Sequence, residues 1–265
     1  MFSVAAYLSA IGYTGGLEAT AGTLRDLHKR HVMALPYDNS RLEDDLAAGV
    51  NGLTLDLEAA FDRVVVQGRG GHCGDLAGLF HRLLRELGFD AHFLTAGLRG
   101  PGGTFGSDSG HVFVGVRLDG ELWLADVGFA GPGYLEPLRV TSEVQHQYGC
   151  AYRVIGAPDP AGDPERATGP EGYCVVERKA QEGDWQALYR FRPRLSDFGA
   201  WDPPEGEDDI LGPGTVIRSR AFENGQSVLL GRRLTRVHDG KEEIRVLIKP
   251  DDYQAALDEI MGGAR

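Results

Sequence analysis

The stretch Arg69–Gly88, which reads RGGHCGDLAGLFHRLLRELG, is the most informative part of the sequence, because it joins a glycine-rich turn to the clearest helical pattern of the chain. Its apolar residues recur at intervals of three and four, at Leu76, Leu79, Phe80, Leu83, Leu84 and Leu87. That spacing is typical of a helix with one face packed on a hydrophobic core. Gly88 can end such a helix as a C-cap residue. The thiol of Cys73 is therefore expected at the start of a core helix.

The sequence pattern changes on either side of this helix. Two further helices are expected before it, within Ala19–Met33 and Leu55–Val66. After about residue 90 the apolar residues alternate, and Asp119-Gly120 has the composition of a two-residue hairpin turn. The remaining expected elements are strands within His111–Arg117, Leu122–Asp126, Tyr152–Ile155, Tyr173–Arg178, Trp185–Phe191, Ser227–Arg236 and Glu243–Ile248, a long loop over Asp202–Gly214, and a closing helix over Asp251–Met261. Helices followed by antiparallel strands predict an α+β fold.

The composition and net charge of the chain restrict which classes of molecule it is expected to bind. The chain has 265 residues and a formal net charge of −12, which disfavours binding to nucleic acid or to anionic membranes. No apolar run approaches the roughly 20 residues of a membrane span, and the N-terminus has no signal-peptide pattern. The three cysteines are too few and too widely spaced for a disulfide framework. We therefore expect a cytoplasmic protein.

Cys73 has the local sequence of a reactive thiol. A thiol at a helix N-terminus is near the positive end of the helix dipole and near unpaired N–H groups, which stabilise a thiolate. The same N–H groups can bind an oxyanion. A lone cysteine beside a leucine-rich helix is equally compatible with a buried core residue. A zinc site built from His72, Cys73 and Asp75 does not fit any common ligand spacing, and we expect no metal.

The hairpin brings a histidine and a carboxylate together. With Asp119-Gly120 as the turn, Leu118 pairs with Glu121, and Phe113 then lies opposite Asp126. His111 lies on the same face as Phe113 and becomes the diagonal neighbour of Asp126. A carboxylate on one imidazole nitrogen leaves the other nitrogen free to take a proton from a nucleophile. An incidental pair on a solvated strand face is the alternative interpretation.

Together these residues resemble the signature of the arylamine N-acetyltransferase family. The resemblance covers roughly residues 1–195 well and the remainder weakly. It rests on several separated motifs in the correct order: Tyr7–Tyr13, Leu24–His28, Leu35–Asn39, Arg69–Cys73, His111 at the start of a valine-rich strand, Trp123–Phe129 and Trp185–Phe191.

This resemblance implies a fold and a site. The fold would be an N-terminal helical bundle over residues 1–89, a central antiparallel β-barrel over residues 90–195 and a C-terminal α/β lid over residues 196–265. Cys73 would be the nucleophile, His111 the base and Asp126 the residue that orients it. The substrate would contact Tyr37, Gly74, Phe105 and Phe129, with Phe105 at the end of a glycine-rich loop that is equally compatible with a plain surface loop.

The chain departs from the family pattern next to the nucleophile. The family usually carries an aromatic residue, Glu and then Asn after the cysteine, where this chain has Gly74, Asp75 and Ala77. A glycine in place of an aromatic residue leaves room for a long acyl chain beside the thiol. Some relatives off-load thioester-bound polyketide–peptide chains as macrolactams, and others close a tetramate or pyridone ring by Dieckmann condensation.

We therefore expect an enzyme that off-loads and cyclises a carrier-bound chain, with Dieckmann closure to a tetramate-type ring favoured over macrolactam formation. An acetyl-CoA:arylamine N-acetyltransferase is the alternative. The donor would be a phosphopantetheine thioester on an acyl or peptidyl carrier protein or on coenzyme A, with no bound cofactor. Papain-like and transglutaminase-like enzymes use the same Cys–His–Asp order along the chain, but this sequence lacks their local signatures. A non-catalytic binding module would not need all three residues.

Overall fold

The helices of the structure agree with those expected from the sequence, with one addition. The computed structural model describes residues 1–41, 56–157, 166–196 and 215–262, so Leu55 and the expected loop Asp202–Gly214 lie outside the described residues. The expected helices are present: α2 (Ala21–Ala34), α4 (Leu57–Phe61) continued by the π-helical turn η1 (Asp62–Val66), α5 (Cys73–Glu86) and α6 (Pro250–Gly262). A short helix that we did not predict, α1 (Val4–Ala10), precedes them.

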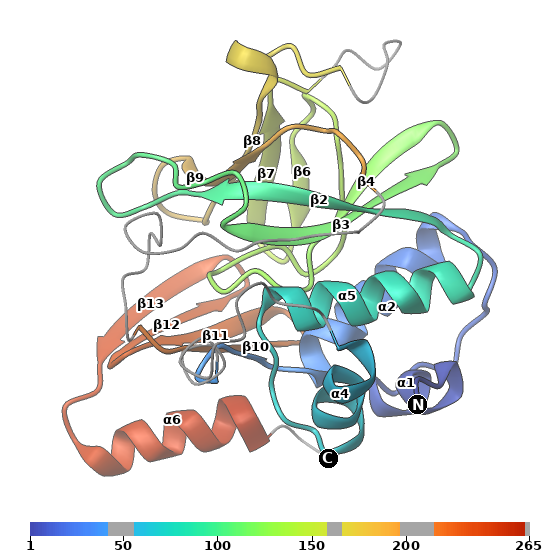
Figure 1. The fold of residues 1–265 in the computed structure, drawn as a ribbon. Coiled ribbons are helices and arrows are strands. Elements are labelled where there is room, and N and C mark those ends of the chain that lie inside the picture. Colours follow the sequence, from blue (N-terminus) through green and yellow to red (C-terminus); the bar gives the residue numbers. More distant parts are fainter. Residues whose placement is uncertain (42–55, 158–165, 197–214, 263–265) are drawn as a thin grey trace.

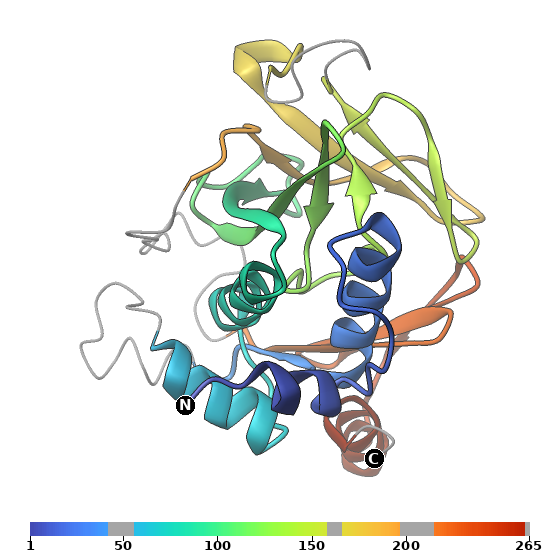
Figure 2. The same cartoon turned by 90° about the vertical axis from the view of Figure 1, so that its right-hand side faces the viewer.

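Helix α5 lies at the centre of the helical part. It begins at Cys73, as expected, and Gly88 follows it with φ +83°, a left-handed conformation that suits glycine. Its apolar stripe is buried, and Leu76, Leu79 and Leu83 have no exposed surface. One face of α5 packs on the strands of the barrel and the other faces α1 and α4 (Figures 1 and 2).

The central sheet is antiparallel and nearly closed into a barrel. Its strand order is β5-β4-β3-β2-β9-β8-β7-β6. The strands are β2 (Asp90–Leu98), β3 (His111–Leu118), β4 (Glu121–Ala125), β5 (Leu138–Arg139), β6 (Gln145–Gln147), β7 (Cys150–Ile155), β8 (Cys174–Lys179) and β9 (Gln186–Phe191). The hairpin β3–β4 has the expected register, with Leu118 opposite Glu121, and Asp119 and Gly120 form the turn with positive φ. The α+β prediction is confirmed.

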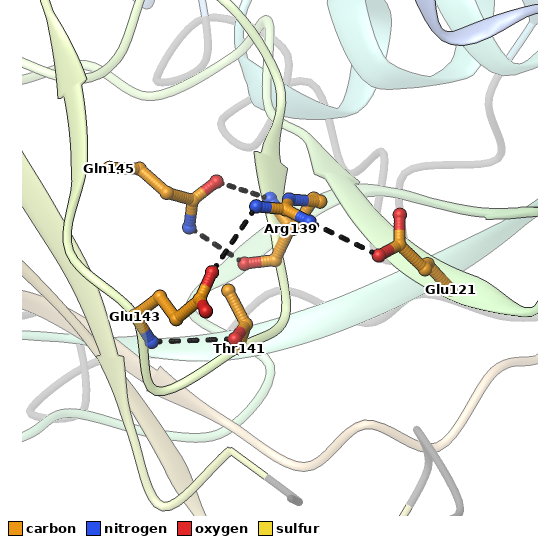
Figure 3. A network of polar contacts seen from close by, with 5 residues as sticks. All are labelled: Glu121, Arg139, Thr141, Glu143 and Gln145. Atoms are coloured by element: carbon orange, nitrogen blue, oxygen red, sulfur yellow. Dashed lines mark hydrogen bonds and ion pairs between the residues drawn. The ribbon is translucent and has the colours of Figure 1, made fainter. Parts of the chain in front are cut away.

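Two glutamine side chains join the two edge strands of the barrel. The amide of Gln145 accepts a hydrogen bond from the Arg139 backbone N–H (2.8 Å) and donates one to the Arg139 carbonyl (2.9 Å), as Figure 3 shows. Gln147 pairs in the same way with Glu136, at 3.0 and 2.8 Å. Because a primary amide presents the same donor and acceptor as a peptide group, these side chains satisfy edge groups that a further strand would otherwise pair with.

A second sheet forms the C-terminal part. Its order is β1-β10-β11-β12-β13, and the strands are β1 (Tyr37–Asp38), β10 (Ile217–Phe222), β11 (Gly225–Leu230), β12 (Arg233–His238) and β13 (Lys241–Val246). The prediction of one strand over Ser227–Arg236 was wrong, because Leu230 pairs with Arg233 across a two-residue turn in which Gly231 has φ +54°. Helix α6 covers this sheet on the side away from the barrel (Figure 1).

Segments far apart in the chain meet in this second sheet. Strand β1 follows the N-terminal helices, yet it pairs with β10, Tyr37 lying opposite Ser219. Asn39 extends the contact, since its side chain donates to the Thr215 carbonyl (3.0 Å) and accepts the N–H of Ile217 (2.7 Å). The domain boundaries at residues 89 and 195 stay a prediction. Within the described residues, no helix combines the length and apolar character that crossing a membrane requires.

Candidate active site

The three residues of the expected triad come from three different elements. Cys73 opens α5, His111 opens β3, and Asp126 directly follows β4. The imidazole Nε2 of His111 lies 2.8 Å from Oδ2 of Asp126, and both residues are buried, with 2% and 4% of their surface exposed. The pairing inferred from the hairpin register is confirmed. Since Nε2 is engaged by Asp126, Nδ1 is the nitrogen left to hydrogen-bond the Cys73 thiol.

Gly128 positions both the carboxylate and the cysteine. Its backbone N–H donates to Oδ1 of Asp126 (3.1 Å), so both carboxylate oxygens have partners. A Cβ atom on Gly128 would lie only 2.8 Å from the Cα of Cys73. A side chain at residue 128 would therefore displace the start of α5. The sequence motif contained this glycine, but only the structure shows what it contacts.

The electrostatics favour an ion pair between thiolate and imidazolium. Burial alone would raise the pKa of Cys73, but hydrogen bonds from His111 and His72 outweigh it and lower the pKa to about 6. Burial would likewise lower the pKa of His111, but the charge of Asp126 and its hydrogen bond, together with Cys73, raise that pKa. A thiolate at neutral pH is the form of cysteine that attacks a carbonyl carbon.

His72 is a second histidine next to the thiol, and the sequence interpretation did not assign it a catalytic role. It is the N-cap residue of α5, and its Nδ1 accepts the N–H of Gly74 at 3.0 Å. Its Nε2 lies 3.4 Å from Oδ2 of Asp75, which also pairs with Arg63 of η1 at 2.7 Å. Burial lowers the pKa of His72, and contacts with Cys73 and Asp75 raise it more. The adjacency of His72 and Cys73 in sequence was the available signal.

Aromatic rings enclose the imidazole of His111. The ring centroids of Phe113, Phe129 and Tyr189 lie 5.7, 5.9 and 5.7 Å from that of His111. The hydroxyl of Tyr189 lies 2.9 Å from that of Tyr134 and hydrogen-bonds Asp126. Such a shell excludes water and strengthens the His111–Asp126 interaction.

The four residues expected to bind substrate lie in different surroundings. Tyr37 and Phe129 line a small cavity of about 30 Å³ beside Asp126. Phe129 also lines a cavity of about 270 Å³ between the barrel and the C-terminal sheet. Gly74 is buried in the first turn of α5. Phe105 lies further out, in contact with Arg99 and Arg190. Their roles in substrate binding stay predictions.

No group of three or more His, Cys, Asp or Glu side chains in the described part of the chain is arranged to hold a metal ion. His72 and Asp75, which the sequence places on either side of Cys73, instead cap α5, and Asp75 also pairs with Arg63.

Comparison with known proteins agrees with this geometry. A family model for N-acetyltransferases matches residues 20–262. The chain belongs to the arylamine N-acetyltransferase family. It is therefore an enzyme of a family of acyltransferases.

Two relatives differ in name and in how much of their length the chain covers. The chain is 36% identical to Proansamycin X synthase of Amycolatopsis mediterranei over 99% of this chain and 98% of that protein. It is 30% identical to the arylamine N-acetyltransferase of Escherichia coli, over 70% of this chain and 59% of that protein. The first similarity extends over the whole chain and the second over its larger part.

Solved structures of the family share the fold. The arylamine N-acetyltransferase of Mycobacterium marinum in complex with CoA superposes with a TM-score of 0.77 at 25% identity, over 98% of this chain and 93% of that one. The enzyme from M. tuberculosis gives a TM-score of 0.76 at 25% identity, over 99% and 93% of the two chains.

Proposed function

We propose that this N-acetyltransferase family member accepts an acyl chain from a phosphopantetheine thioester onto Cys73 and releases it by ring closure with a nucleophile of the chain itself. The observation that carries this proposal is the buried His111–Asp126 pair in contact with a cysteine at the N-terminus of α5. A thiolate held by an imidazolium is a nucleophile for thioester carbonyls and also a good leaving group, so it serves both half-reactions.

In the first half-reaction, the Cys73 sulfur attacks the carbonyl carbon of the donor thioester. The new C–S bond forms, the C–S bond to the pantetheine arm breaks, and the departing pantetheine thiolate takes the proton of His111. The N–H of Cys73 is at the first position of α5, where no intrahelical partner exists, and it is available to the tetrahedral oxyanion. Asp126 keeps the imidazole in the tautomer that faces the thiol.

In the second half-reaction, a nucleophile within the same acyl chain attacks the acyl-cysteine. His111, now neutral, takes the proton of that nucleophile, and the Cys73 thiolate leaves. An amine would close a macrolactam, and an enolate carbon would close a tetramate-type ring by Dieckmann condensation. Gly74, in place of the family's aromatic residue, favours a long acyl chain in either case, and of the two closures we favour closure by carbon.

Two features support a long acyl chain over an acetyl group. The cavity of about 270 Å³ begins at Phe129, beside the His111 ring, and much of its lining is apolar, including Leu98, Leu188, Val228 and Leu230. Each methylene buried there would contribute about 0.8 kcal/mol. The similarity to Proansamycin X synthase, which spans both chains, also favours a biosynthetic role over arylamine acetylation.

The test uses three thioesters of N-acetylcysteamine: an acetyl thioester with aniline, an N-(β-ketoacyl)aminoacyl thioester, and a long ω-amino acyl thioester. We expect poor aniline acetylation and rapid cyclic release from one of the two long substrates. A tetramate product supports carbon closure and a macrolactam supports nitrogen closure. Rapid aniline acetylation with both long substrates left intact would instead identify an ordinary arylamine N-acetyltransferase. Cys73→Ala, the control, should form none of these products.

A further inference from the structure

A ladder of alternating arginine and aromatic side chains lies on the rim of the barrel, outside the triad. The guanidinium of Arg99 lies 5.4 Å from the ring centre of Phe105, and that of Arg190 lies 5.5 Å from the same ring. Arg190 also lies 4.4 Å from the ring centre of Tyr173, whose ring carries Arg192 at 3.8 Å. We call these five residues the arginine ladder.

The arginine ladder has more positive charge than its neighbours neutralise. Asp108 is shared between Arg190 and Arg192, at 3.5 and 2.5 Å, and it also accepts the hydroxyl of Tyr173. Within the described ranges, no carboxylate pairs with Arg99, and the buried Nε of Arg190 has no hydrogen-bond partner. The three guanidinium groups thus have one carboxylate among them, which pairs with two of the three, in a chain whose formal net charge is −12.

The stacking leaves the ladder ready to bind an anion. An arginine stacked on an aromatic ring is held in place through its plane, while the N–H groups around its edge stay available. Those N–H groups match the oxygens of phosphate, which can accept two of them from one guanidinium. The side chains of Arg190 and Arg192 are about one-third exposed, at 31% and 34%, so an anion can reach them.

A cavity extends from Arg99 of the ladder to Phe129, whose ring contacts that of His111. Arg99 lines the cavity of about 270 Å³, and Phe129 lines the same cavity. The Phe129 ring lies 5.9 Å from the ring of His111. A molecule bound by its anionic end at Arg99 can therefore extend past Phe129 towards the base and the thiol.

We propose that the arginine ladder binds the phosphate of the phosphopantetheine arm that delivers the acyl chain, and that the cavity holds the arm. This inference rests on the function proposed above, because it assumes that the donor is a phosphopantetheine thioester. It gives Phe105 a defined role, which is to hold Arg99 and Arg190 in register with each other.

The experiment compares two donors that differ by one phosphate: the phosphopantetheine and the pantetheine thioesters of the same long acyl chain. The readout is the ratio of their kcat/KM values for acylation of Cys73, followed by mass spectrometry. In the unmodified protein we expect the phosphorylated donor to be preferred roughly tenfold or more, and the preference to fall with added salt. Arg192→Gln and Arg99→Gln should each reduce that ratio, mainly through the KM of the phosphorylated donor.

Arg117→Gln is the matched control, because Arg117 is a half-exposed arginine at the far end of β3, near Asp90. It should leave the ratio unchanged. Thermal unfolding of each variant shows that it folds. If both donors react equally well in the unmodified protein and in all variants, the arginine ladder has only a structural role and this inference is wrong. The proposed function would still stand. If neither donor acylates Cys73, the proposed function itself is overturned.

Discussion

At the scale of single residues, the hydrogen bonds of Asp126 determine which nitrogen of His111 carries the proton. One oxygen accepts the backbone N–H of Gly128 and the other faces Nε2 of His111. The backbone donor cannot change, so the oxygen facing Gly128 must remain an acceptor. The remaining oxygen holds the Nε2–H tautomer, which leaves Nδ1 free to act as the base for Cys73 in the function proposed above.

Asp126→Asn should therefore abolish most activity while the protein stays folded. The amide oxygen of Asn has to accept the Gly128 N–H, which turns its NH₂ group towards Nε2 and forces the proton onto Nδ1. We expect the rate of Cys73 acylation to fall on the order of 10⁴-fold, as in other triads with the wrong tautomer. Near-normal acylation in a folded Asp126→Asn protein would show that the carboxylate does not orient the base.

At the scale of elements, the first turn of α5 combines a structural cap with the reactive thiol. His72 accepts the Gly74 N–H, and the Asp75 carboxylate, 3.3 Å away, accepts the N–H of His72, which together form a capping box. The same imidazole hydrogen-bonds the thiol of Cys73. Two histidines therefore influence the pKa of this thiol. One is His72, which is next to Asp75 and Arg63, and the other is His111, which pairs with Asp126.

Two substitutions of His72 separate the cap from the thiol contact. His72→Asn keeps a good N-cap acceptor but loses the imidazole, and His72→Phe loses both. The Cys73 pKa is lowered to about 6, so its alkylation by iodoacetamide should rise as the pH rises through that value. In both variants Cys73 should need a higher pH than in the unmodified protein to be alkylated at the same rate. Only His72→Phe should also lose free energy of unfolding, by about 1 kcal/mol.

Mass-spectrometric mapping of the labelled cysteines checks this expectation. Cys150 and Cys174 serve as internal references, because both are buried and burial raises the pKa of Cys174 to about 12. Faster labelling of either reference, or an unchanged pH profile in His72→Asn, would contradict the role assigned to the first turn of α5.

At the scale of the whole molecule, an ion pair of a buried arginine and a partly exposed glutamate joins the barrel to the C-terminal sheet. Arg178 of β8 lies 2.5 Å from Glu242 of β13, and their side chains are 4% and 24% exposed. Both residues line the cavity between the two sheets. Removing one partner would leave a charge in a site from which water is largely excluded.

Glu242→Leu should therefore lower the free energy of unfolding by about 2–3 kcal/mol. This loss is at the lower end of the range for breaking a buried pair, because Glu242 is partly exposed. The double variant Arg178→Met/Glu242→Leu should recover most of that loss. Glu143→Leu is the control, since the Arg139–Glu143 pair is exposed on both sides and should contribute less than about 1 kcal/mol. Urea unfolding measures all three, and equal losses in the single and double variants would contradict this account.

The features that could be predicted from the sequence are those set by neighbours along the chain. The apolar spacing of α5, the cap at Gly88 and the hairpin at Asp119-Gly120 are local, and the hairpin register alone brought His111 to Asp126. The break at Gly231 was also local, and we missed it because apolar residues such as Leu229 and Leu234 lie on both sides of it.

Only the tertiary structure decided the contacts between distant segments. It brings Gly128 against Cys73, pairs β1 with β10, closes the barrel edges through Gln145 and Gln147, and stacks Phe105 between two arginines. None of these follows from periodicity, because each depends on how separately formed elements pack once their apolar faces are buried together. The sequence thus determined which residues we propose to carry the chemistry, and packing determined how the Cys73 thiol, the His111 imidazole and the cavity lie relative to one another.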